Sequence, residues 1–374
     1  MKFTVKRDDL HQAVSAVQRA TATRVIQPIL SNILIESVDK NQLKLSATDL
    51  DFAIETHIPI KVLEAGKTTL SAKKLSEIIS KLPNGMDVTF EIDEKVQTAR
   101  IQCGTSLFDM RTLPADEFPL IKHIDQDSYL DVNLRALIRA VNQTVFAAAS
   151  YDANNVLGGV FFKLGAQGLE MAATDGSRLA RRLEPVSPKG KAPEEVTAII
   201  PSKTLMELTR LVGTPGSDQT IRLAIVDGQI SFRTDSVYVL SRLLDGQYPK
   251  YDQLIPTENK IVILAKRQAF IDSLERAAVM ANERTNIVKM MFDKGNLSLA
   301  ANTPDVGDSK DNMEVNYDGE PLNIAFNYKF VLDALRVIES DDVRLETNGA
   351  LAPTLFKGND EGEYLCLVMP VQVK

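Results

Sequence analysis

The segment Leu43-Lys-Leu-Ser-Ala-Thr-Asp49 returns 126 residues later as Leu169-Glu-Met-Ala-Ala-Thr-Asp175. A fainter version, Leu297-Ser-Leu-Ala-Ala-Asn-Thr303, follows 128 residues after that. Apolar and polar side chains alternate through the first copy, which is typical of a β-strand with one buried face. The nearly constant step indicates three versions of one structural unit of about 125 residues.

Amphipathic helical patterns recur at nearly the same step. Apolar or small residues spaced i, i+3, i+4 occur at Leu10-x-x-Ala13-Val14, Leu137-x-x-Ala140-Val141 and Phe270-x-x-Ser273-Leu274. A second set of helical stretches begins at Lys73, Lys203 and Lys329. Strand-like runs such as 29–38, 87–92 and 221–226 lie between them, so each unit is predicted to hold two helices packed on β-sheet. This is an α+β fold class with three similar domains, because the period exceeds the roughly 20–50 residues of solenoid repeats.

Proline and glycine mark the ends of the first two units. Residues 113–119 read Leu-Pro-Ala-Asp-Glu-Phe-Pro, and a similar segment runs from Leu244 to Pro256. Such residues interrupt regular structure where one domain gives way to the next. We therefore expect domains at residues 1–125, 126–256 and 257–374.

Composition is that of an ordinary globular protein. The 374 residues include 43 Lys and Arg against 50 Asp and Glu, and 44% are hydrophobic. No apolar run approaches the roughly 20 residues that a membrane-spanning helix needs, and the N-terminus lacks the pattern of a signal peptide, so a cytoplasmic location is expected. Cys103 and Cys366 lie far apart in strand-like runs and are expected to be reduced packing residues.

Several kinds of catalytic or metal site lack support in the sequence. The three histidines, His11, His57 and His123, do not have the spacing of a helical metal site, so we expect no metal and no cofactor. Walker, Rossmann and Gly-x-Ser-x-Gly motifs are missing from the sequence. Asp175, Ser177 and Arg178 could form a hydrolytic site, but no histidine follows His123 to act as a base. A β-turn in which Asp175 caps the backbone and Gly176 has a positive φ is the favoured interpretation.

Basic residues recur on the predicted helices of this acidic chain, whose excess negative charge lies in residues 257–374. The set comprises Lys6, Arg7, Arg19, Lys73, Lys74, Lys81, Arg135, Arg139, Lys203, Arg210, Lys266, Arg267, Lys329 and Arg336. Any one pair could be a solvated helix face. If equivalent helices share one side, however, they form a positive surface suited to sequence-independent contacts with nucleic-acid phosphates.

Several motifs in order resemble the bacterial DNA polymerase III beta subunit, or sliding clamp, over essentially the whole chain. They are Met1-Lys-Phe-Thr-Val5, Gln27-Pro-Ile-Leu-Ser-Asn32, Ala173-Thr-Asp-Gly-Ser-Arg-Leu179, Asp245-Gly-Gln-Tyr-Pro249-x-Tyr251 and Val368-Met-Pro370. The resemblance implies three clamp domains per chain and a head-to-tail homodimer that closes into a six-domain ring. It also implies a non-catalytic processivity factor that encircles duplex DNA and tethers the replicative polymerase.

The resemblance assigns three groups of residues. Candidate contacts to the DNA backbone are Arg24, Lys73, Lys74, Lys203, Lys266 and Arg284. The candidate pocket for a Gln/Leu/Phe-type partner peptide is formed by Leu157, Thr174, Gly176, Arg178, Leu179, Pro249, Leu254, Leu367, Met369 and Pro370. Candidate dimer contacts are Lys74, Ile78, Phe108, Met110, Val279 and Met280.

The implied partners are duplex DNA, a second copy of the chain, the polymerase III catalytic subunit, the clamp loader, and other polymerases and repair proteins that carry clamp-binding peptides. Ser177, Asn154 and the ending Val371-Gln-Val-Lys374 depart from the family pattern and leave the selectivity of the pocket open. Two rival interpretations remain at this stage: the hydrolytic site, and an acidic monomeric scaffold that does not encircle DNA.

Overall fold

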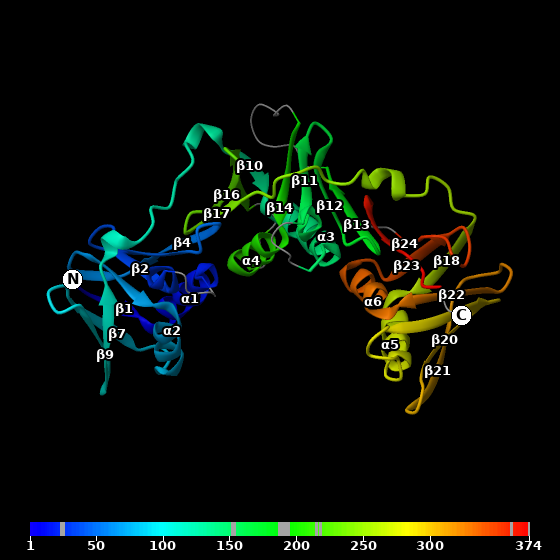
Figure 1. The fold of residues 1–374 in the computed structure, drawn as a ribbon, viewed down its shortest axis with the longest axis horizontal. Coiled ribbons are helices and arrows are strands. Elements are labelled where there is room, and N and C mark those ends of the chain that lie inside the picture. The colour runs from blue at the N-terminus through cyan, green and yellow to red at the C-terminus, as the bar shows by residue number, and fades with distance from the viewer. Residues whose placement is uncertain are drawn as a thin grey trace. The chain divides into compact units, whose positions relative to one another are not determined.

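The computed structural model describes residues 1–22, 27–150, 155–185, 195–213, 216, 219–359 and 362–372. The chain folds into two compact units, one made of residues 1–134 with 207–243 and the other of residues 135–206 with 244–374. Each unit packs helices against antiparallel β-sheet, so the predicted α+β class is confirmed (Figure 1).

A single sheet of thirteen strands forms the first unit. Its order is β10-β15-β16-β17-β4-β3-β2-β6-β9-β8-β7-β1-β5. The strands are β1 (Lys2–Lys6), β2 (Asn32–Ser37), β3 (Gln42–Thr48), β4 (Phe52–Pro59), β5 (Lys61–Glu64), β6 (Lys67–Ser71), β7 (Asp87–Asp93), β8 (Thr98–Cys103), β9 (Ser106–Leu113), β10 (Leu130–Asn133), β15 (Thr220–Val226), β16 (Gln229–Arg233) and β17 (Val237–Arg242).

Two sheets form the second unit. One has the order β14-β11-β12-β13-β25-β24-β23-β18 and the other β21-β20-β19-β22. The strands are β11 (Gly159–Gly165), β12 (Gly168–Thr174), β13 (Arg178–Glu184), β14 (Val196–Pro201), β18 (Ile261–Lys266), β19 (Ile287–Asp293), β20 (Asn296–Thr303), β21 (Gly307–Glu314), β22 (Leu322–Asn327), β23 (Asp342–Thr347), β24 (Thr354–Gly358) and β25 (Tyr364–Val368).

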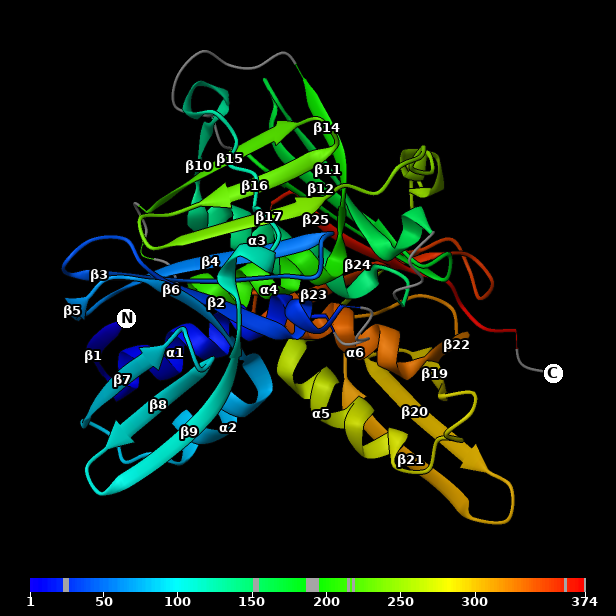
Figure 2. The same ribbon diagram turned by 60° about the vertical axis from the view of Figure 1, so that its left-hand side comes forward.

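Each α-helix begins where a strand ends. The helices are α1 (Arg7–Val17), α2 (Ala72–Lys81), α3 (Leu134–Thr144), α4 (Ser202–Val212), α5 (Arg267–Ala278) and α6 (Tyr328–Val337). The predicted helical spacing places Leu10, Ala13 and Val14 in the core under α1, which lies against β3 and β4. In the second unit α5 lies along β20 and β21 (Figure 2). These faces are buried because their apolar residues repeat with the helical period.

Two arginines do not join the expected basic helix face. Arg7 is buried and donates from Nε to the carbonyl of Ile79 (3.1 Å) and from Nη2 to that of Ser80 (3.2 Å), at the end of α2. Arg267 makes the corresponding bond to the carbonyl of Ser340, just beyond α6 (3.0 Å). Both side chains therefore satisfy carbonyl groups at or near the end of the neighbouring helix.

Strand pairing also joins segments that the sequence assigned to different domains. In the first unit β4 pairs with β17, and in the second β13 pairs with β25. The middle part of the chain therefore contributes strands to both compact units. The predicted strand at 29–38 is partly wrong: Pro28–Ser31 form a short 3₁₀ helix, and the strand begins at Asn32. Proline at the first helical position favours that turn.

Both cysteines are free and buried, as predicted. Within the described part of the chain, no helix is long and apolar enough to cross a membrane. The same residues include no group of three or more His, Cys, Asp or Glu side chains placed to hold a metal ion.

Candidate functional site

A tight turn between β12 and β13 organises the candidate pocket. The Thr174 hydroxyl donates to the carbonyl oxygen of Arg178 (2.6 Å), and Asp175 Oδ1 accepts from the backbone N–H groups of Ser177 (2.9 Å) and Arg178 (3.1 Å). Gly176 has φ +87°, a conformation that favours glycine. The turn interpretation is thus confirmed, and the Asp175 carboxylate serves to hold the backbone.

Four strands contribute a row of residues to the floor of the site. Thr174 lies opposite Leu179, Leu179 opposite Leu367, and Leu367 opposite Leu355. Leu179 is only 1% exposed and Leu367 is also buried. These leucines pack in one apolar cluster with Tyr248 and Tyr251. The floor is therefore a continuous buried apolar layer across β13, β25 and β24.

Two tyrosines from the segment after β17 support this floor. The Tyr248 hydroxyl accepts from the backbone N–H of Thr174 (3.1 Å), and burial raises the pKa of this phenol to about 12. The Tyr251 hydroxyl donates to Glu170 Oε1 (3.0 Å), which also accepts from Arg181 Nε (2.6 Å). Burial, with the Glu170 carboxylate as a second cause, raises the Tyr251 pKa as well. Both rings stay neutral and fixed, and they contribute apolar surface.

Exposed apolar side chains stand at the rim of this cluster. Leu254 ends the 3₁₀ helix η7 (Tyr251–Leu254) and is 55% exposed, although Tyr251 at the start of that helix is buried in the cluster. Met369 is 40% exposed, and its backbone N–H donates to the carbonyl of Ser177 (2.9 Å). Pro249 is exposed, and Leu157 and Pro370 are half-buried. A buried apolar floor with exposed leucine and methionine at its rim suits the docking of a short apolar peptide.

Arg178, one of the candidate pocket residues, is bound by side chains and backbone of its own chain. Its guanidinium donates to Asp175 Oδ2 (3.0 Å), Asp333 Oδ2 (2.7 Å) and the carbonyl of Phe146 (2.6 Å). It also stacks over the Phe330 ring, 4.4 Å from the centroid. Neighbouring residues of a strand face opposite sides, so this side chain lies across β13 from Leu179. In this structure Arg178 anchors the turn to α6.

Sequence reasoning did not assign roles to Asp333, Phe330, Tyr248 or Tyr251. The motif that contains both tyrosines was visible, but the motif alone does not show which of its side chains carry the floor. Asp333 lies 155 residues beyond Arg178, and no local pattern links the two.

The candidate DNA contacts lie near helix ends and turns. Lys73 and Lys203 are the second residues of α2 and α4, and Lys266 immediately precedes α5. Lys266 Nζ lies 2.8 Å from Asp342 Oδ1, Lys203 is half-buried, and Arg284 is exposed in the turn after α5. Arg24 lies outside the described residues.

The candidate dimer contacts fall into two groups. Phe108 and Met110 are on β9, with Lys74 and Ile78 on α2, in the first unit. Lys74 pairs with Glu77 of the same helix (2.8 Å). Val279, which is largely exposed, and Met280 directly follow α5 in the second unit.

Two strands near these groups have unpaired edges among the described residues. β9 pairs with β8 along most of its length but with β6 only at Thr112 and Leu113. β21 pairs only with β20. Such edges are templates for pairing with another chain.

Comparison with known proteins decides the family. Three family models match in order: the DNA polymerase III beta subunit N-terminal domain over residues 1–122, its central domain over 131–250 and its C-terminal domain over 252–372. The chain belongs to the DNA polymerase III beta subunit family. The predicted resemblance and fold are thereby confirmed.

Relatives of the DNA polymerase III beta subunit family match over their full length. The beta sliding clamp of Synechococcus elongatus is 34% identical over 377 residues, covering all of both chains. The crystal structure of the Bacillus subtilis DNA polymerase sliding clamp aligns with TM-score 0.90 and 30% identity, again covering both chains completely. The Caulobacter crescentus sliding clamp aligns with TM-score 0.87 and 31% identity over both whole chains.

Proposed function

We propose that this protein is a DNA polymerase processivity factor: a homodimeric ring that encircles duplex DNA, slides along it and tethers the replicative polymerase. The observation that carries the proposal is the match of all three beta-subunit domain models, in order, along one chain. We propose domain limits at 1–125, 126–256 and 257–374, in line with those matches. The chain acts as a non-catalytic subunit in the cytoplasm.

The exposed rim at Leu254 and Met369, together with the buried layer of Leu179 and Leu367, is the proposed attachment point for partners, called the peptide cleft below. A peptide with an aromatic and one or two leucine side chains would cover the exposed rim above the buried floor. Burial of so few side chains gives modest affinity, which allows polymerases, the clamp loader and repair proteins to exchange. The flexible Met369 side chain suits peptides of differing sequence.

The basic residues Lys73, Lys74, Lys203, Lys266 and Arg284, with Arg24, are proposed to contact the DNA backbone. Lysine and arginine bind phosphate without reading bases, so binding is independent of sequence and falls with salt. Weak contacts of this kind let the ring slide.

The proposed dimer joins the first domain of one chain to the third domain of the other. The unpaired edge of β9 beside Phe108 and Met110, and that of β21 near Val279 and Met280, support this pairing. Two copies of the contact related by a twofold axis close a ring.

A primer-extension assay with the replicative polymerase and its clamp loader tests the proposed function. With a trap that captures released polymerase, the protein should lengthen the products made in one binding event. Met369→Ala should shorten those products, and loading of the variant ring is measured separately because the clamp loader is proposed to use the same site. Products of equal length with and without the protein would refute the proposal.

A further inference from the structure

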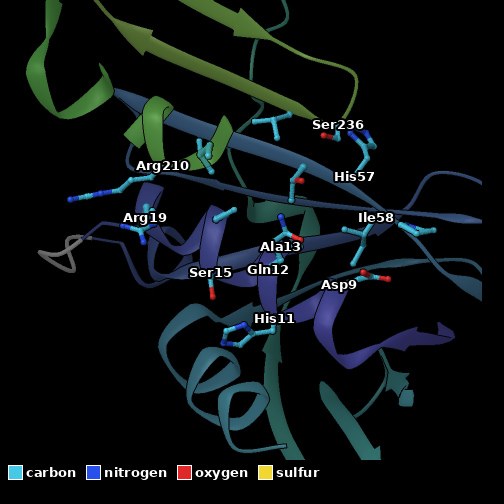
Figure 3. A pocket seen from close by; sticks show the side chains of 15 residues that line it. Asp9, His11, Gln12, Ala13, Ser15, Arg19, His57, Ile58, Arg210 and Ser236 are labelled. Carbon is cyan, nitrogen blue, oxygen red and sulfur yellow. The ribbon is translucent and has the colours of Figure 1, made fainter. Parts of the chain in front are cut away.

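A cleft of about 520 Å³ lies in the first unit, and its lining includes Arg19 and Arg210 of the basic set but none of the candidate DNA, peptide or dimer contacts. Figure 3 shows it between α1, the last turns of α4 and the end of β4. Polar and charged side chains predominate in its lining, including His11, Gln12, Arg19, His57 and Arg210. Its volume lies within the range of small-ligand sites, but its polar lining differs from their usual apolar one.

One buried carboxylate joins two arginines at one end of this cleft. Arg19 Nη1 donates to Glu207 Oε2 (3.2 Å), and Arg210 Nη1 donates to Glu207 Oε1 (2.7 Å). Glu207 is buried, whereas both arginine side chains are exposed. Glu207 therefore holds two guanidinium groups, one from the 3₁₀ turn after α1 and one from α4. Figure 3 shows Arg19 and Arg210 at the same end of the cleft.

The charge at this end of the cleft is positive. Two guanidinium groups share one carboxylate, which leaves a net charge of one, and each keeps further N–H donors beyond the bond to Glu207. Asp9, the acidic residue of the lining, is labelled at the opposite end of the view (Figure 3). A guanidinium fork matches the oxygens of a phosphate group, and arginines already held in place lose less entropy on binding.

We propose that Arg19 and Arg210 form a phosphate clip that holds the backbone of duplex DNA, with Glu207 as the residue that positions them. This inference rests on the proposed function and adds a defined site to it. The clip contacts phosphate only, so it slows sliding equally on every sequence. Free phosphate offers the same chemistry, and the test separates the two sources.

Anisotropy of a labelled short duplex, titrated with the full-length protein at several salt concentrations, tests the clip. Arg19→Ala and Arg210→Ala should each weaken binding about three- to tenfold and lower the slope of log K against log salt by about 1. The double variant Arg19→Lys with Arg210→Lys should have the salt slope of the unaltered protein but only part of its affinity for DNA. Lysine keeps the positive charge but lacks the forked guanidinium. Arg242→Ala is the matched control, since Arg242 is exposed in the same unit and pairs with Asp51.

Unchanged affinity and slope in both alanine variants would overturn the clip. NMR of the arginine side chains is recorded during titrations with inorganic phosphate and with duplex DNA. Signals that shift with phosphate but not with duplex would overturn the DNA assignment. Retention of the loaded ring on circular DNA is measured in parallel. If the unaltered protein stays on circular DNA and the alanine variants stay equally long, the clip is refuted but the proposed function is not. If the unaltered protein does not stay on circular DNA, the proposed function itself is refuted.

Discussion

Met369 and Met291 are a matched pair for testing the peptide cleft. They are 40% and 42% exposed in the same unit, but Met369 lies beside the 174–178 turn and Met291 lies on β19 in the other sheet. Met369→Ala should weaken a polymerase-tail peptide more than about tenfold, because it removes the adaptable rim. Leu254→Ala should act in the same direction. Fluorescence titration in which Met369→Ala and Met291→Ala have equal affinity would contradict the assignment.

Leu179 gives a less specific test, since its side chain is part of the floor and also of the core. Leu179→Ala should weaken the peptide more than tenfold, and the cavity it leaves should cost about 2–5 kcal/mol of stability. Thermal unfolding measured beside the titration separates the two effects. Unchanged peptide affinity in the folded variant would remove Leu179 from the site.

His57 should make the stability of the first unit depend on pH. Burial lowers its pKa from 6.5, although the Glu55 carboxylate acts in the opposite direction. The unfolded chain therefore binds this proton more readily, and stability falls as pH drops through 6.5 toward the folded pKa. The loss should stay below about 1 kcal/mol, because the side chain is only half-buried. Urea unfolding at pH 7.5 and 5.5 should show a smaller loss for His57→Gln; equal losses would contradict this.

At the scale of elements, the first unit contains a counterpart of the turn and strand pairing at the proposed peptide site. Thr48 donates to the Phe52 carbonyl (3.0 Å) as Thr174 does to that of Arg178, and Leu50, at the position of Gly176, has φ +83°. Ala53 lies opposite Leu240 as Leu179 lies opposite Leu367. The β4–β17 pair in the first unit and the β13–β25 pair in the second therefore have the same turn and the same strand pairing.

In the first unit the linker, which is the segment between β9 and β10, covers this counterpart. Ile124 follows Pro119 by the same five residues that separate Leu254 from Pro249, yet it is 6% exposed and packs on Ala53 and Leu240. His123 holds the linker there, with Nε2 2.8 Å from Glu55 Oε2. We therefore expect one peptide per chain in isothermal titration calorimetry. A stoichiometry of two would contradict this account.

The edge of β9 should govern dimer formation. Replacing Phe108 and Met110 by alanine should raise the dimer dissociation constant at least about tenfold, because interface energy concentrates in a few packed apolar anchors. Leu63→Ala on β5 is the control, since Leu63 is an exposed apolar residue of the same sheet that lies away from β9. Analytical ultracentrifugation should give a mass of twice 41.2 kDa for the unaltered protein. An unchanged dissociation constant in the double variant would place the interface elsewhere.

Local patterns in the sequence predicted the repeat, the helices, most strands and the turn at Asp175, because their periods and turn residues are local signals. The pairing of β4 with β17 was not predicted, since edge pairing between distant segments has no local signature. The environments of Arg7 and Arg178 were also missed. Their partners lie 72 and 155 residues away, and the same residue type fits an exposed basic face equally well.

At the scale of the whole molecule, the central claim is that DNA passes through a closed dimer. The direct measurement is the half-life of the loaded protein on a nicked circular plasmid before and after one restriction enzyme linearises it. A ring should persist on the circle and leave the linear molecule quickly through its free ends, at the same salt concentration. Equal half-lives on circular and linear DNA would show that the protein binds the surface of DNA, and would contradict this account.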